Sequence, residues 1–212
     1  MHSISLPATA TARERLLAAA EQLIYSGGIH ATGIDAIVRA SGTARKSMYS
    51  HFASKNELVA AALQQRHLRW LDWFCAAVEA HGGSAHDRLV AVFDVLRTWF
   101  VSDGFHGCAF LNAAGEIGEP DDPVRRVAHA HKAELRAYLA TLTGAYGLPH
   151  GASLEQTTAL ARQWLVLIDG AIGVALVSGN PDAALDARAI GLSLLGNPAG
   201  PALSASPNST PR

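Results

Sequence analysis

The chain has 212 residues, of which 49% are hydrophobic and 17% charged, enough apolar material for one sizeable core or two small cores that share an interface. No apolar run reaches the roughly 18 uninterrupted residues that a membrane span needs, and the opening residues lack the apolar stretch of a secretory signal. We therefore expect a cytoplasmic protein with no membrane partner. Its two cysteines, Cys75 and Cys108, cannot build a disulfide framework.

The net charge of −1 hides an asymmetry along the chain. Residues 1–70 carry eight Lys and Arg against four Asp and Glu, whereas residues 71–212 carry nine against fourteen. A basic front and an acidic rear suggest a polyanionic partner for the front, although a short basic segment can also be solvated surface.

Apolar residues recur at spacings of three and four with no sustained alternation, which predicts an all-α fold. A first helix has an apolar face formed by Leu16, Ala20, Leu23 and Ile24, and it ends at Gly27 and Gly28. A second, short helix follows Thr32 and ends at Ser41 and Gly42, and a third covers residues 44–50 with Thr43 as its N-cap. Ser54 and Glu57 fit a capping box that opens a long helix reaching about residue 80.

The rear of the chain repeats the helical spacing between breaks rich in Gly, Pro and Ser. The predicted helices there cover residues 87–101, 110–117, 122–143, 154–177 and 183–195. The last segment is rich in Pro and Ser, which predicts disorder. The expected organisation is a disordered tail at 1–10, a helix-turn-helix DNA-binding domain at 11–56, a helical ligand-binding and dimerisation domain at 57–196, and a second disordered tail at 197–212.

Two short helices joined by a Ser-Gly-Thr turn have the geometry of a helix-turn-helix. The run from Thr32 to Leu58 resembles the amino-terminal signature of TetR-family regulators. That resemblance implies a three-helix DNA-reading domain followed by a helical ligand-binding and dimerisation domain. It also implies a homodimer that binds a palindromic double-stranded DNA operator.

The residues of the third helix fit this resemblance. Met48 and Phe52 lie four apart and should pack on the second helix, which leaves Arg45, Lys46 and Tyr49 to face the groove. Tyr49 and Lys55 match family residues that touch DNA, whereas the family often has Gly at the position of Lys46. The predicted DNA contacts, each of which could instead be a solvated side chain, are Thr43, Arg45, Lys46, Tyr49, His51 and Lys55.

Aromatic and apolar side chains of the rear helices could enclose a cavity with a few orienting polar groups. A filled core is an equally good interpretation for any one of the aromatic residues. Asp169 interrupts an apolar run and needs a partner if it is buried. The candidate ligand-binding residues are Phe74, Phe93, Leu96, Trp99, Phe110, Asn112, His131, Trp164 and Asp169.

The last two predicted helices combine an apolar face with small residues that permit close approach. In the family that the chain resembles, these helices form a four-helix dimer interface, and burial within one subunit is the alternative. The candidate interface residues are Leu165, Ile168, Ile172, Leu176, Leu185, Ala189 and Leu192.

These features predict a bacterial transcriptional regulator, a repressor released from its operator by a small, largely apolar inducer of unknown identity. We expect no enzyme activity and no cofactor. We also expect no metal site, since His129 and His131 are two apart and point to different sides of a helix. One alternative is a DNA-binding regulator without an inducer. Another is a thiol enzyme or redox sensor that uses Cys108 with His106 or His131.

Overall fold

The computed structural model describes residues 9–196 of the chain, so the tail predicted at 197–212 and most of the one at 1–10 lie outside it. The described part contains α-helices, one short 3-10 helix and no strand, which confirms the all-α prediction. The helices are α1 (Ala12–Gly27), α2 (Ile34–Ser41), α3 (Arg45–His51), α4 (Lys55–Ala80), α5 (Ala85–Phe100), α6 (Ala109–Glu116), α7 (Pro123–Gly147), the 3-10 helix η1 (Leu148–His150), α8 (Leu154–Ser178) and α9 (Ala183–Gly196).

The three front helices enclose a small core of their own. Met48 and Phe52 are buried there, as predicted, together with Ile37 and the first helix's Leu16 and Leu17. Burial of these large side chains, each contributing about 1.5–3 kcal/mol, holds α3 against α1 and α2. The polar face of α3 is thereby left outside.

Two predicted helix caps differ from the structure. Thr43 was expected to cap α3, but the N-cap is Ala44, which makes no side-chain hydrogen bond, and the Thr43 hydroxyl instead lies 2.7 Å from Ser41 Oγ. At α4, the Ser54 hydroxyl accepts from the Glu57 backbone N–H as predicted. The Glu57 carboxylate accepts from the Ala53 N–H rather than from that of Ser54, so only half of the capping box forms.

The rear helices enclose a larger core. Trp164 is fully buried at its centre and donates from Nε1 to the Leu89 carbonyl at 3.1 Å, which satisfies the one polar atom of its ring. Gly191 of α9 lies against the rings of Phe93 and Trp164, where a Cβ would come within 3.0 and 3.1 Å of them. A glycine at this position therefore lets α9 pack closely on α5 and α8.

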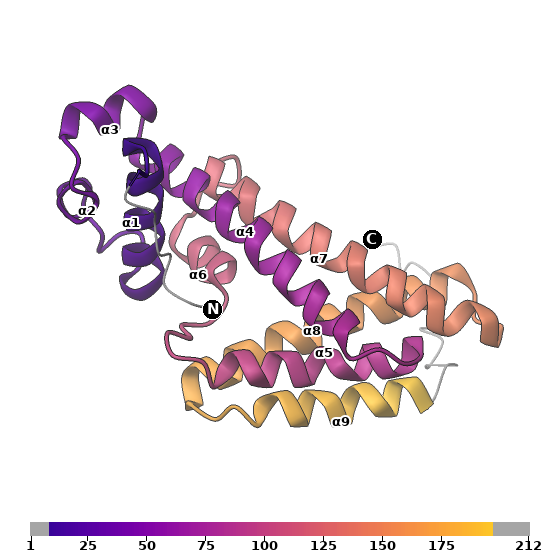
Figure 1. The fold of residues 1–212 in the computed structure, drawn as a ribbon. Helices are drawn as coiled ribbons and strands as arrows, with labels where there is room; N and C mark the ends of the chain where they lie inside the picture. The colour runs from indigo at the N-terminus through magenta and orange to yellow at the C-terminus, as the bar shows by residue number, and fades with distance from the viewer. Residues whose placement is uncertain (1–8, 197–212) are drawn as a thin grey trace, which may run out of the picture.

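Helix α4 joins the two cores. Leu58 and Ala62 are buried in the small core, whereas Val59, Leu63 and Phe74 are buried in the large one. Figure 1 shows α4 running from the end that carries α1, α2 and α3 to the layer formed by α5, α8 and α9, with α7 beside it. A displacement within the rear helices therefore has a direct route to the front ones.

Helix α8 keeps an apolar face outside. It is long and apolar enough to cross a membrane by length and composition, yet a third of its most apolar window is buried inside the protein. Val166, Val174 and Val177 are 70%, 56% and 89% exposed. An exposed apolar stripe of this kind marks a contact surface.

Candidate functional site

The outer face of α3 carries cations and an aromatic ring. Arg45 and Lys46 are exposed, and Tyr49 is 47% exposed beside them. The Arg45 guanidinium lies 5.9 Å from the centre of the Tyr49 ring, and its Nη1 donates to Asp35 at 2.7 Å. Because an exposed ion pair of this kind contributes little, a phosphate can replace Asp35 at low cost.

The other three predicted DNA contacts differ in how exposed their side chains are. His51 is exposed at the end of α3, whereas Thr43 is half-buried. Lys55 is also half-buried, and its Nζ donates to the Ile29 carbonyl at 2.5 Å, which ties the start of α4 to the turn between α1 and α2. An ammonium group has three protons, so Lys55 still has protons to offer a phosphate.

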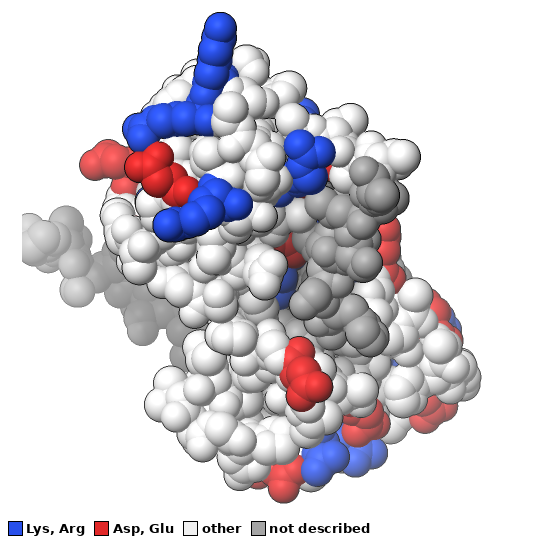
Figure 2. Space-filling view, turned by 60° about the vertical axis from the view of Figure 1, so that its left-hand side comes forward, with Lys and Arg blue, Asp and Glu red and all other residues white. Residues whose placement is uncertain are grey.

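Lys and Arg side chains gather at the end of the molecule that carries α2 and α3, with a few carboxylates beside them (Figure 2). The opposite end in this view mixes blue and red side chains. The uneven charge of the sequence therefore becomes a basic surface over the helix-turn-helix, which suits a polyanion.

The large core contains a small cavity beneath α6. It encloses about 10 Å³, room for one water-sized molecule. Three of the predicted ligand-binding residues, Trp99, Phe110 and His131, lie in its wall. The wall consists of Arg66, Trp70, Trp99, Cys108, Ala109, Phe110, His131, Lys132, Leu135 and Ile172.

The remaining predicted ligand-binding residues lie elsewhere. Phe74, Phe93, Leu96 and Trp164 are packed in the core and do not line this cavity. Asn112 lines a second cavity of about 10 Å³ between α1, α4 and α6, and its side-chain amide donates to the His106 carbonyl at 2.9 Å. Asp169, which was expected to need a partner, forms an ion pair with Lys132.

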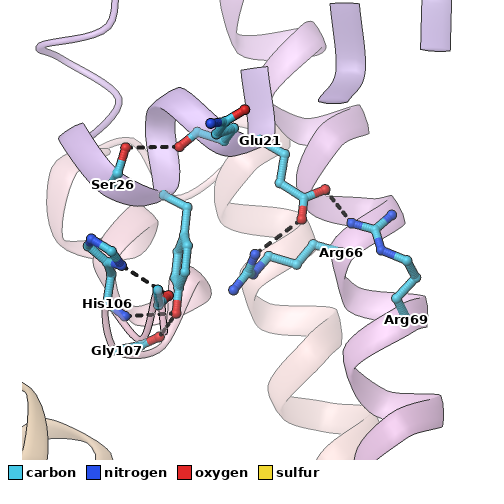
Figure 3. A network of polar contacts seen from close by, with 9 residues as sticks. Glu21, Ser26, Arg66, Arg69, His106 and Gly107 are labelled. Atoms are coloured by element: carbon cyan, nitrogen blue, oxygen red, sulfur yellow. Dashed lines mark hydrogen bonds and ion pairs between the residues drawn. The ribbon is translucent and has the colours of Figure 1, made fainter. Parts of the chain in front are cut away.

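A buried polar network joins α1 to α4, and it was not predicted from the sequence. The Glu21 carboxylate is buried and pairs with two guanidinium groups, Arg66 at 3.1 Å and the more exposed Arg69 (Figure 3). The Arg66 guanidinium also lies 3.6 Å from the centre of the Tyr25 ring. One buried arginine therefore holds two side chains of α1 against α4.

The same network reaches the segment before α6. The Tyr25 hydroxyl donates to the Gly107 carbonyl at 2.9 Å and accepts from the His106 backbone N–H at 3.0 Å. Burial raises the pKa of the Tyr25 hydroxyl, and the nearby Arg66 partly opposes that rise. Tyr25 therefore stays neutral and serves as both donor and acceptor.

The carboxylate of Glu116, at the end of α6, grips the turn between α1 and α2. It accepts from the backbone N–H groups of Ile29 at 2.8 Å and His30 at 2.7 Å. The His30 ring Nε2 lies 2.8 Å from the Glu116 carbonyl oxygen, which adds a third contact. We refer to these three contacts as the Glu116 clamp.

The exposed apolar surface on α8 and α9 includes some of the predicted dimer residues and leaves out others. Ile168 and Ile172 are buried within the protomer. Leu176 contacts Gly107, where a Cβ would lie 2.7 Å from its Cδ2, yet Leu176 is 43% exposed, as expected for an interface residue. Leu165 is half-buried, whereas Leu185, Ala189 and Leu192 of α9 are exposed as expected. The stripe left outside, called the α8–α9 seam below, consists of Val166, Gly170, Val174, Leu176, Val177, Leu185, Ala189, Ile190 and Leu192.

Cys108 is buried at the N-cap of α6. Among residues 9–196 no hydrogen bond joins its thiol to His106 or His131, the partners considered for thiol chemistry. The other thiol, Cys75, is half-buried, and burial followed by the charges of Asp72 and Glu79 raises its pKa to about 11. The Cys75 thiol therefore lacks the surroundings of an activated nucleophile.

A sequence profile described as "Bacterial regulatory proteins, tetR family" matches residues 16–62, which include α2, α3 and the start of α4. This segment of the chain, which holds the helix-turn-helix, is of the TetR-family type. The fold of the chain also matches a TetR-family transcriptional regulator from Streptomyces coelicolor, with a TM-score of 0.78 and 29% identity over 89% of this chain and 96% of that one. A putative TetR-type regulator from Streptomyces avermitilis gives a TM-score of 0.75 and 29% identity over 88% and 99% of the two chains.

Among curated proteins, the chain is similar to the HTH-type transcriptional repressor NemR of Escherichia coli. The two are 24% identical over 114 residues, which are 53% of this chain and 57% of NemR. The chain therefore matches little more than half the length of that relative.

Proposed function

We propose that the protein is a homodimeric DNA-binding transcriptional regulator that represses transcription until a small ligand releases it from its operator. The observation that carries the DNA-binding part is the outer face of α3. Two exposed cations and a half-exposed tyrosine stand on a short helix whose other face is locked into a core. A helix of this kind, second in a helix-turn-helix, can enter the major groove with its side chains toward the bases and phosphates.

The α8–α9 seam supports the dimer. Valine side chains that are more than half exposed, next to Gly170, give an apolar face that two copies can bury against each other. A two-fold axis through such a seam pairs two α3 helices. Half-sites about 34–36 Å apart, one turn of DNA, are the spacing that such a dimer reads.

Repression and release are proposed from a relative and from the position of the cavity. NemR is named a repressor. In this chain, the cavity under α6 and the polar network share Arg66, so a ligand that enters the cavity contacts the group that holds α1. Release of α1 from α4 would change the distance between the two α3 helices of a dimer.

The DNA-binding proposal can be tested with no operator sequence in hand. We would select binding sites from random double-stranded DNA with the full-length protein, and we expect a palindrome with half-sites about one helical turn apart. Lys46→Ala and Tyr49→Ala should then weaken binding to that site without loss of helical circular dichroism. The loss of one phosphate contact, expected for Lys46→Ala, should lower the slope of log affinity against log salt by about 0.9.

The matched control is Arg97→Ala, which removes an exposed cation on α5 that pairs with Asp182. It should leave both the affinity and the salt slope unchanged. If no palindrome is enriched, or if the α3 variants bind as tightly as the control, the DNA-binding proposal fails.

A second candidate function is a DNA-binding regulator that needs no inducer. The observation that favours it is cavity size, because the cavity under α6 and the one lined by Asn112 each enclose only about 10 Å³, far below the roughly 300–1,000 Å³ of typical ligand sites. A ligand would therefore have to open its own site. A screen of small organic molecules for thermal stabilisation, run with and without operator DNA, separates the two functions.

A further inference from the structure

The cavity under α6 has an unusual set of polar groups. Both of its ionised lining groups are cations, Arg66 and Lys132. The Nε1–H of Trp70, which also lines it, is buried and has no hydrogen-bond partner among residues 9–196. A buried donor without an acceptor costs about 1–3 kcal/mol, so an acceptor brought into this space would be stabilised.

The carboxylates that pair with these cations do not line the cavity. Arg66 donates to Glu21 at 3.1 Å, and Lys132 pairs with Asp169, but neither acid is in the cavity wall. The cavity wall therefore presents cations, while the carboxylates that pair with them lie outside it. Burial, and then the charges of Lys132, His67 and Arg66, lower the pKa of His131 to about 2, so this ring is neutral at ordinary pH.

The rest of the wall is aromatic. The rings of Phe110 and His131 are stacked, with centroids 3.7 Å apart and planes 14° from parallel. Trp70 meets His131 edge-on at 5.2 Å and Trp99 at 5.5 Å. Flat rings with a neutral imidazole among them favour a flat apolar body in the ligand.

We propose that this cavity binds a small aromatic carboxylate, which pairs with Lys132 and Arg66, accepts from Trp70 Nε1–H and packs its ring against His131. The proposal rests on the proposed function, since it names the class of ligand that releases the regulator. It replaces the largely apolar inducer expected from the sequence with an anionic one.

The ligand makes room by moving Phe110, which belongs to the eight-residue α6. Gly104 and Gly107, in the segment before α6, have φ angles of +85° and +76°, and glycine tolerates such angles without strain. The carboxylate also competes with Glu21 for Arg66. Both effects act on α1, through the Glu116 clamp and through the buried ion pair.

The test compares an acid with its neutral isostere on the full-length, DNA-free protein. Calorimetry or tryptophan fluorescence would be used with 1-naphthoate and 1-naphthamide, and separately with benzoate and benzamide. We expect saturable binding of one acid per protomer, with the amide about ten-fold weaker or worse, because a hydrogen bond to a charged group contributes about 1.5–3 kcal/mol. Equal affinity for acid and amide, or no binding of either acid, overturns the proposal.

Variants locate the site. Lys132→Met keeps the length of the side chain and removes its charge, and it should weaken 1-naphthoate binding about ten-fold. The double variant Lys132→Met with Asp169→Asn avoids an unpaired acid and keeps the test open if the single variant unfolds. Trp70→Phe should weaken the acid more than the amide, whereas Arg97→Met, on the outer surface, should change nothing. Acid binding that Lys132→Met and the double variant leave unchanged would overturn the assignment.

Operator affinity, measured on the same preparations, separates this proposal from the broader one. Operator binding without acid binding overturns the ligand class and leaves the DNA-binding proposal standing. Acid binding that lowers operator affinity supports both. Acid binding by a protein that selects no DNA site would support the cavity as a carboxylate site and overturn its role in releasing DNA.

Discussion

The Glu116 clamp gives a prediction whose magnitude follows from the structure. Glu116→Ala removes the acceptor of two backbone N–H groups, those of Ile29 and His30. The His30 N–H is exposed and can bind water instead, whereas the Ile29 N–H is partly buried and would be left without a partner. That loss costs about 1–3 kcal/mol of unfolding free energy. In a protein of this length the melting temperature should fall by roughly 2–12 °C.

The assay combines thermal unfolding with hydrogen exchange resolved by peptide. Exchange should increase at the turn between α1 and α2 and change little in α8. Glu116→Gln keeps one acceptor oxygen and should give an intermediate result. The matched control is Glu119→Ala, three residues further on, whose exposed side chain makes no hydrogen bond or ion pair within residues 9–196.

The reasoning is refuted if Glu116→Ala melts within a degree of Glu119→Ala and the turn exchanges at the wild-type rate. In that case the contacts at 2.7 and 2.8 Å contribute nothing that water does not replace. Destabilisation spread evenly over the protein, with no local increase in exchange at the turn, would also contradict a clamp that acts on α1 and α2.

Three further predictions concern the dimer, the core and pH. Val174→Asp places a charge in the α8–α9 seam and should give monomers with weaker operator binding in sedimentation and DNA-binding assays; Leu68→Asp, an exposed site on α4, should stay dimeric. Gly191→Ala brings a Cβ within 3.0 and 3.1 Å of two aromatic rings and should cost about 1–3 kcal/mol in chemical denaturation, whereas Gly115→Ala meets nothing within 4 Å and should be neutral or stabilising. Burial lowers the pKa of His131 in the folded protein to about 2. The contribution of the neutral ring to stability is therefore complete above the unfolded pKa of about 6.5 and is lost as the pH falls toward 2, by up to about 1.4 kcal/mol per pH unit. In unfolding experiments at a series of pH values, His131→Gln should lose stability less steeply over this range.

The helices were predictable because the spacing of apolar residues and the positions of Gly, Pro and capping residues act locally. The predicted end of α4 at residue 80 and start of α8 at Leu154 match the structure. The predicted N-cap of α3 was wrong because a residue with a high capping preference can form another hydrogen bond instead. The Thr43 hydroxyl lies within hydrogen-bond distance of Ser41, and the helix begins one residue later.

The cavity was less predictable, since a core residue and a cavity residue have the same helical spacing. Phe93 and Trp99 are both buried residues of α5, yet only Trp99 lines the cavity. Nothing local in the sequence indicates that Glu21 meets Arg66, 45 positions away, because the packing of α1 on α4 brings them together. A charged residue can therefore belong to a buried network that the sequence alone does not indicate.

The structure concentrates two tasks on α6. Ala109 and Phe110, at its start, form part of the cavity wall, and Glu116, at its end, holds the turn between α1 and α2. The other helices around the cavity are poorly suited to move, because α4, α5, α7 and α8 are 26, 16, 25 and 25 residues long and bury side chains along their length. The cavity can thus expand at least cost by displacing α6, and any displacement of α6 acts on the clamp. If ligand binding is coupled to the DNA-binding helices in this way, operator DNA must weaken ligand binding by the same factor by which the ligand weakens operator binding. For a coupling free energy of about 1–3 kcal/mol, this factor is on the order of 5–150-fold. Glu116→Ala should then reduce both factors together, and a reduction of only one would contradict the coupling.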